Sequence, residues 1–247
     1  MPLQGDGDKE RRSAFVAGAT GYTGREIVRV LCERGVATVA HVRPDSPRLA
    51  HWRSYFSELR AIVDTTAWDE AAMTATLRRL RPDCVFVAVG TTRRRMKQAV
   101  DEGADPATVG YDAVDYGLTA LLLSAVVKAR IRPRFIYLSA TGVRPHARGA
   151  YYKARWRAEE AVRKSGLPYI IARPSFIVGP GRDERRPLET LGARLIDGAL
   201  TAAGLLGAAR LKARYHSTTN TALAEALVRL AFDPSAAGRL FEADELR

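Results

Sequence analysis

Three evenly spaced glycines near the N-terminus form a candidate phosphate-binding turn. They are Gly18, Gly21 and Gly24 in the segment GATGYTG. An apolar run typical of a strand, AFVAG (14–18), comes before them, and a run with helical periodicity, 22–34, follows. At such a strand-to-helix turn, backbone N–H groups and the positive end of the helix dipole can receive a pyrophosphate. The pattern therefore predicts a dinucleotide-binding turn, and a tight connection without a ligand is the alternative interpretation.

Each glycine has a distinct role in this geometry. Gly18 permits the sharp turn, Gly21 lets the phosphate approach the backbone, and Gly24 lets the helix pack closely on the strand. The turn residues expected to contact the cofactor are Gly18, Thr20, Gly21, Tyr22, Thr23 and Gly24.

The residue after the second predicted strand indicates which dinucleotide is bound. The strand VATVAHV (36–42) is followed by Arg43, and the first acidic residue, Asp45, comes two positions later. NAD sites usually carry an acidic residue here for the ribose 2′-hydroxyl, whereas NADP sites offer an arginine to the 2′-phosphate. The sequence favours NADP, with NADPH preferred over NADH. The alternative is that Arg43 is an ordinary solvated side chain.

Strands and helices alternate along most of the chain. Strands are predicted at 14–18, 36–42, 59–64, 83–90, 134–139 and 168–174, and helices at 22–34, 66–80, 106–130, 149–166, 188–206 and 219–232. The segment 47–58 is ambiguous. The run DCVFVAVG (83–90) is apolar on both faces, as central strands of parallel sheets are. Such alternation implies right-handed βαβ crossovers, and it predicts an α/β fold with a Rossmann-like doubly wound parallel sheet.

We expect a single NAD(P)-binding domain. Residues 1–12 are polar and charged and are predicted to form a disordered N-terminal tail. Residues 13–247 make up the Rossmann-like domain, in which the segments after residue 174 form a small C-terminal substrate lobe. The helices at 106–130 and 149–165 could pair in a homodimer.

Composition limits the classes of partner. The formal net charge is +12, but the basic residues are dispersed and form no recognised module, which argues against a nucleic-acid surface. The chain has no run of eighteen apolar residues, so no membrane span is predicted. Cys32 and Cys84 each lie in an apolar run and are interpreted as buried small side chains, not as a disulfide or a metal site. A cytoplasmic protein is the simplest interpretation.

Seven segments carry a resemblance to a known family. In chain order they are GATGYTG, VRP, IVD, VGTT, YLSATG, ARPSFIVGPG and YHSTTN. With them the chain resembles the atypical short-chain dehydrogenases/reductases, and within these the NAD(P)H-binding group that includes NmrA-like proteins and the Tat-interacting oxidoreductase. The resemblance extends from about residue 13 to the C-terminus. It is specific to the superfamily and not to one reaction.

The resemblance implies further cofactor contacts. Asp64 would contact the adenine, the loop after the fourth strand would line the cofactor, and the segment after the sixth strand would lie beside the nicotinamide. Ordinary strand-end capping is the alternative for Asp64 and Thr91. The residues implied are Asp64, Gly90, Thr91, Thr92, Pro174, Ser175 and Ile177.

The catalytic arrangement of the resembled family is present only in part. Short-chain dehydrogenases use a Tyr and a Lys four residues apart on one helix, with a Ser at the end of the preceding strand. The lysine charge helps the tyrosine to transfer a proton near neutral pH. Here Arg155 stands four residues after Tyr151, and arginine differs from lysine in size and donor geometry. Ser139 and Thr141, in YLSATG, are the two candidates for the hydroxyl that polarises a carbonyl.

These patterns leave three interpretations open. In the first, the protein is an NADPH-dependent oxidoreductase acting on a small carbonyl compound, with Tyr151 as proton donor and Arg155 as its electrostatic and ribose partner. Ser139 or Thr141 would then polarise the carbonyl. In the second, it is an epimerase or dehydratase of the same fold. In the third, it is an NADP-binding sensor without turnover, which the arginine in place of lysine favours. The first two imply a small-molecule substrate as partner.

Overall fold

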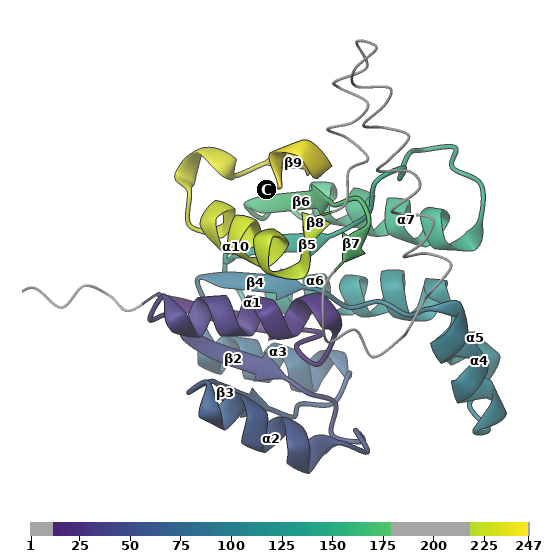
Figure 1. Cartoon of the computed structure of the whole chain (residues 1–247), viewed down its shortest axis with the longest axis horizontal. Helices are drawn as coiled ribbons and strands as arrows, with labels where there is room; N and C mark the ends of the chain where they lie inside the picture. Colours follow the sequence, from purple (N-terminus) through teal and green to yellow (C-terminus); the bar gives the residue numbers. More distant parts are fainter. Residues whose placement is uncertain (1–11, 179–217, 247) are drawn as a thin grey trace, which may run out of the picture.

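A seven-stranded parallel sheet forms the centre of the protein. The computed structural model describes residues 12–178 and 218–246 (Figure 1). The strands of the sheet are β1 (Ser13–Ala17), β2 (Ala37–His41), β3 (Ile62–Asp64), β4 (Cys84–Val87), β5 (Arg134–Leu138), β6 (Tyr169–Arg173) and β9 (Arg239–Glu242). Their order is β3-β2-β1-β4-β5-β6-β9, and every neighbouring pair is parallel. The predicted Rossmann-like α/β fold is confirmed.

Helices cover both faces of the sheet (Figure 1). One apolar layer contains side chains of α1, α2 and α10, and the layer on the opposite face contains side chains of α3, α6 and α7. The bounds are α1 (Tyr22–Glu33), α2 (Leu49–Glu58), α3 (Glu70–Leu80), α6 (Leu118–Lys128), α7 (Ala150–Lys164) and α10 (Asn220–Ala231).

Strand β4 explains why both layers are needed. Its four residues are all buried, with Cys84 and Phe86 in the α1 layer and Val85 and Val87 in the opposite layer. Successive side chains of a strand point to opposite faces, so a strand without polar residues must be covered twice. The doubly apolar sequence therefore places β4 in the middle of the sheet, beside β1.

The helix predicted at 106–130 is interrupted. The structure has a short α5 (Pro106–Val109), a π-helical segment (Asp112–Gly117) and then α6. Gly110 ends α5 with an extended backbone, φ −71° and ψ 170°. The prediction of one continuous helix was wrong because apolar periodicity alone does not register this extended residue or the wider helical turn after it.

Several elements escaped the sequence patterns. Helix α4 (Arg93–Asp101) is mostly charged or polar and buries none of its residues, so its apolar pattern is weak, and it projects with α5 beyond the body of the sheet (Figure 1). Strand β9 has only four residues and forms the edge of the sheet. The ambiguous segment 47–58 is largely helical, as α2. A separate pair, β7 (Ile177–Val178) and β8 (Thr218–Thr219), is also parallel.

Several expectations lie partly or wholly outside the described residues. These are the N-terminal tail, the helix at 188–206 and most of the substrate lobe after residue 174. Within the described part, Cys84 is buried, Cys32 is half-buried, and both are free thiols. Among the described helices, none has the length and apolar character that crossing a bilayer requires.

Candidate functional site

The candidate site residues follow six strands that end at one edge of the sheet, β1 to β6. Gly18 follows β1, Gly90 lies shortly after β4, and Ser139 follows β5. Because all the strands are parallel, their carboxyl ends meet at the same edge. The chain order reverses between β1 and β4, and dinucleotides bind in the crevice at such a reversal. The topology thus brings together the glycine turn and the loop after β4.

The glycine turn is packed too closely for any side chain at its first and third glycines. Gly18 has φ +79°, and a Cβ there would lie 2.6 Å from the carbonyl oxygen of Ala88. A Cβ on Gly24 would overlap the carbonyl oxygen of Gly18 and lie 2.8 Å from its carbonyl carbon. The N–H of Gly21 donates to the same Gly18 oxygen at 2.9 Å. The turn is therefore held between the end of β4 and the first turn of α1.

The start of α1 has the features of an anion-binding turn. Gly21 is its N-cap residue, with an extended backbone and no side chain that could cap the helix. The first helical turn contains no acidic side chain. A helix N-terminus of this kind offers backbone donors and a positive dipole end to a phosphate. The residues present fit the pyrophosphate of a dinucleotide.

Arginines gather near the end of β2. Arg43 is exposed and forms a 3.5 Å ion pair with Asp45, which is exposed as well. The guanidinium carbon of Arg48 lies 4.8 Å from the ring centroid of Trp52, and that of Arg25 lies 5.8 Å from it. Trp52 itself is buried. Sequence reasoning singled out Arg43 alone, because nothing local to the sequence links Arg25 to a tryptophan on another helix.

Two other predicted cofactor residues make local capping contacts. The carboxylate of Asp64 accepts hydrogen bonds from the backbone N–H and the hydroxyl of Thr66, at 3.1 and 3.0 Å. The hydroxyl of Thr92 accepts from the N–H of Arg95 at the start of α4, at 3.2 Å. Both are placed at the carboxyl edge by the ends of β3 and β4.

Arg155 is buried beneath the loop that follows β4. Its guanidinium forms a 2.8 Å ion pair with Asp115 and donates to the carbonyl oxygens of Leu138 and Val89, at 2.5 and 3.3 Å. It also donates to the Tyr137 hydroxyl at 3.4 Å. Only 8% of the residue is exposed. Arg155 therefore joins the ends of β4 and β5 through hydrogen bonds to backbone carbonyl groups there.

Asp115 is a site residue that sequence reasoning missed. It is completely buried in the π-helical segment, and its carboxylate accepts the backbone N–H of Thr91 at 3.0 Å. Burial raises the pKa of Asp115, while the charge of Arg155 and the Thr91 hydrogen bond oppose that rise. Burial would lower the pKa of Arg155, but Tyr137, Tyr151 and Asp115 beside it raise it on balance, so it stays charged. The sequence offers little signal for it, because Asp112, an exposed aspartate, stands three positions earlier in the same segment.

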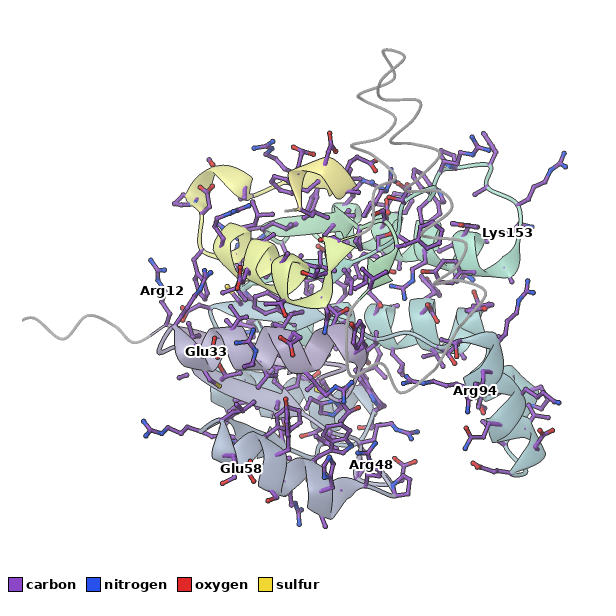
Figure 2. All side chains as sticks on the ribbon, in the orientation of Figure 1. Arg12, Glu33, Arg48, Glu58, Arg94 and Lys153 are labelled. Carbon is purple, nitrogen blue, oxygen red and sulfur yellow. The ribbon has the colours of Figure 1, made fainter. Side chains whose placement is uncertain are left out.

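Tyr151 lies next to Arg155, as their spacing on α7 requires. The guanidinium carbon of Arg155 is 5.4 Å from the Tyr151 ring centroid. The same ring has edge contacts with Tyr111 and Tyr152, at centroid distances of 5.3 and 5.2 Å. Lys153 is exposed on the outer side of the helix (Figure 2). The cation beside Tyr151 is thus the arginine and not the nearby lysine.

The hydroxyl groups of Ser139 and Thr141 both have acceptors within the protein. Ser139 is buried and donates to the Glu159 carboxylate at 2.6 Å. Thr141 is half-buried and donates to the carbonyl oxygen of Arg173 at 3.0 Å. Either hydroxyl would have to exchange its acceptor in order to donate to a substrate.

The segment after β6 lies against the loop that follows β5. Pro174 is buried, and its carbonyl oxygen accepts the N–H of Thr141 at 3.0 Å. Ser175 and Ile177 are half-buried, and Ile177 pairs with Thr218 in the small β7–β8 sheet. The carboxyl ends of β5 and β6 therefore form one continuous wall of the site.

The family of the protein follows from the Rossmann-like sheet and its glycine turn, together with a match to a known family. A family model described as NAD(P)H-binding matches residues 18–234, from the first glycine of the turn to just beyond α10. The chain belongs to the NAD(P)H-binding family. This confirms the resemblance at the level of that group, and the narrower likeness to NmrA-like proteins stays a prediction.

The relatives of this NAD(P)H-binding protein are distant. A ceramide reductase from Caulobacter vibrioides is 28% identical over 180 residues, which are 72% of this chain and 50% of that protein. The chain thus spans about half the length of this curated relative. Among solved structures, AtPrR2 with NADP+ and (+)pinoresinol has a TM-score of 0.64 at 15% identity, covering 96% of this chain and 72% of its own. The enzyme WbmH of Bordetella bronchiseptica with NAD+ has a TM-score of 0.58 at 19% identity, with 90% and 72% covered. At these identities the structural likeness concerns the fold alone.

Proposed function

We propose that this NAD(P)H-binding protein is an NADPH-dependent oxidoreductase that reduces a small carbonyl compound. The observation that carries the proposal is the position of Tyr151, which stands beside the buried charge of Arg155 on the helix that follows β5. That helix and the glycine turn both adjoin the carboxyl edge of the sheet, where family members bind their nicotinamide cofactor. The name of the Caulobacter relative, a reductase, agrees with this reaction class.

The proposed reaction assigns separate tasks to a few side chains. When bound, NADPH supplies a hydride to the carbonyl carbon. The Tyr151 hydroxyl gives its proton to the carbonyl oxygen, and the positive charge of Arg155 stabilises the anion left on the tyrosine. Thr141, the less buried of the two candidate hydroxyls, would orient the carbonyl, while Ser139 holds Glu159. The products would be an alcohol and the oxidised cofactor, and Tyr151 would regain its proton from solvent.

The proposed cofactor site extends along the carboxyl edge. The glycine turn binds the pyrophosphate, Arg43 binds the 2′-phosphate, and Asp64 faces the adenine. The loop after β4 and the segment after β6 enclose the nicotinamide half. The full set proposed is Gly18, Thr20, Gly21, Tyr22, Thr23, Gly24, Arg43, Asp64, Gly90, Thr91, Thr92, Pro174, Ser175 and Ile177.

Tyr151→Phe tests the proposed reaction. Loss of the phenolic hydroxyl removes the proton donor, so we expect kcat to fall by about 100-fold or more, with the Kd for NADPH nearly unchanged. The measurements are absorbance at 340 nm with a panel of aldehydes, ketones, quinones and ceramide-related carbonyl lipids, and NADPH fluorescence for binding. Tyr152→Phe is the matched control, because Tyr152 is the adjacent and exposed tyrosine of the same helix. Equal turnover by wild type and Tyr151→Phe would contradict the assignment.

A non-catalytic NADP sensor is the second candidate function. The observations that favour it are the engaged hydroxyl groups of Ser139 and Thr141 and the ion pair that occupies Arg155. Binding of NADPH by the wild type without turnover of any carbonyl in the panel would favour this candidate. Inversion of configuration at a sugar carbon, without net oxidation or reduction, would instead favour an epimerase of the same fold.

Arg43→Ala tests the proposed preference for NADPH. Loss of a charge-assisted contact to the 2′-phosphate should weaken NADPH binding by about tenfold, while NADH binding changes little. Fluorescence titration with both cofactors measures the two losses. Arg34→Ala is the matched control, since Arg34 is also exposed but follows the C-terminus of α1, at the opposite edge of the sheet. Equal losses for NADPH and NADH would rule out Arg43 as the selecting residue.

A further inference from the structure

We propose that Asp115 and Arg155 form a positioning pair, which fixes the loop Gly90–Thr92 in the conformation that receives the cofactor. This inference rests on the proposed cofactor site and adds Asp115 to it. It also gives Arg155 a second task beside the electrostatic one proposed above, because the pair acts through the loop and not by touching the reacting atoms.

The contacts of the pair converge on the loop from two sides. Asp115, on the π-helical segment, accepts the N–H of Thr91 at 3.0 Å. Arg155, on α7, donates to the carbonyl oxygen of Val89 at 3.3 Å. The 2.8 Å ion pair closes the bridge between the two helical elements. The backbone on both sides of Gly90 is therefore tied to one buried pair of charges.

Gly90 fits the pair so closely that any larger residue would force the Arg155 guanidinium to move. A Cβ there would lie 2.5 Å from Nη2 of Arg155 and 3.2 Å from Oδ1 of Asp115. Gly90 does not have a positive φ, so the need for a glycine here comes from the close packing and not from the backbone conformation. The glycine after β4 thus allows the loop to settle directly on the guanidinium.

The π-helical segment orients Asp115 toward the loop. In this segment the N–H of Leu118 bonds to the carbonyl of Ala113, five residues earlier, so the turn is wider than in an α-helix. The Asp115 carbonyl is occupied by the hydroxyl of Thr119, which is buried. Such wide turns occur frequently at functional sites, where they direct one side chain away from the regular helical path.

Burial prevents Arg155 from acting as a ribose ligand. Asp115 has no exposed surface, and the two terminal nitrogens of Arg155 already donate to carbonyl oxygens. Its remaining nitrogen, Nε, is buried and has no hydrogen-bond partner among the described residues. A buried ion pair of this kind stabilises little compared with apolar groups of equal size, but it defines one arrangement of the groups around it.

Two variants separate positioning from bulk stability. In Asp115→Leu with Arg155→Met, apolar groups replace both charges, so we expect Tm to stay within a few degrees of wild type. NADPH affinity should nevertheless fall about tenfold, and the Thr91 amide should exchange its hydrogen at least about tenfold faster in the cofactor-free protein. Arg155→Lys keeps the charge and loses the planar fork. We expect Arg155→Lys to show the same weaker NADPH binding and faster Thr91 exchange. This variant therefore tests the inference even if the double variant fails to fold.

A second ion pair between the same two elements supplies the matched control. Arg157 and Asp112 also join α7 to the π-helical segment, but both are exposed. Asp112→Leu with Arg157→Met should leave NADPH affinity and Thr91 exchange unchanged. Thr91 exchange is followed by NMR without cofactor, so it does not depend on the proposed function.

The outcomes distinguish the two proposals. Unchanged Thr91 exchange in both variants, or wild-type NADPH affinity in both, would overturn the positioning pair. Failure of the wild type to bind NADPH would overturn the proposed function, and faster Thr91 exchange in the variants would still establish that the pair holds the loop. Wild-type NADPH affinity and wild-type Thr91 exchange in Arg155→Lys, together with full turnover, would show that only the charge of this residue matters and would likewise overturn the inference.

Discussion

Gly24→Ala is expected to abolish cofactor binding and to lower Tm by about 10 °C. The added Cβ would overlap the carbonyl oxygen of Gly18 and lie 3.0 Å from Cα of Ala19. Both are backbone atoms, so no flexible side chain can move aside. Gly18 cannot retreat either, because it is already packed against Ala88 on its other side. Overpacking costs about 3 kcal/mol in such cases, which corresponds to this change in Tm for a chain of this size.

The control for this substitution is Gly110→Ala. Gly110 also has a negative φ, but a Cβ there would meet only the Pro106 carbonyl oxygen, at an ordinary 3.6 Å. Its Tm should match wild type or rise slightly. Thermal unfolding by circular dichroism and NADPH fluorescence measure the two effects. Normal cofactor binding by Gly24→Ala would mean that the turn does not pack on α1 as closely as described.

Glu159→Gln is expected to destabilise the protein by about 3–5 kcal/mol. Glu159 is completely buried and accepts from Ser139 and from two nitrogens of Arg173, at 2.6, 2.9 and 2.7 Å. It also pairs with Arg163 at 2.8 Å. Loss of its charge leaves the largely buried guanidinium of Arg173 with only the pair to Glu242 to compensate it. Breaking a buried pair in this way costs more than the pair itself contributes.

Glu160→Gln is the matched control, one position along the same helix. Glu160 is more exposed and pairs with Arg163 and Lys164, at 3.2 and 3.5 Å. Exposed pairs contribute less than about 1 kcal/mol, so this variant should unfold at nearly the wild-type urea concentration. Equal losses of stability in the two variants would show that the buried ion pairs of Glu159 contribute no more than the exposed pairs of Glu160. Because Glu159 joins Ser139 at the end of β5 to Arg173 at the end of β6, its loss should also weaken NADPH binding.

The sequence by itself determined the frame of the site. The glycine spacing predicted the turn, and the doubly apolar run at β4 predicted a central parallel strand. The four-residue spacing on α7 brought Tyr151 and Arg155 to one face. These predictions succeed because helical and strand periodicity, glycine turns and capping are set by residues a few positions apart. The role of each residue in cofactor binding or catalysis stays a prediction.

Only the tertiary structure decided which partners the polar groups have. Sequence patterns offered Ser139 to a substrate and Arg155 to a ribose, whereas the structure gives them to Glu159 and Asp115. Nothing in the sequence distinguished the buried Asp115 from the exposed Asp112 three positions earlier, and β9 was too short to detect. The physical reason is that buried polar groups must find partners wherever the fold brings them, and those partners lie on other elements far along the chain.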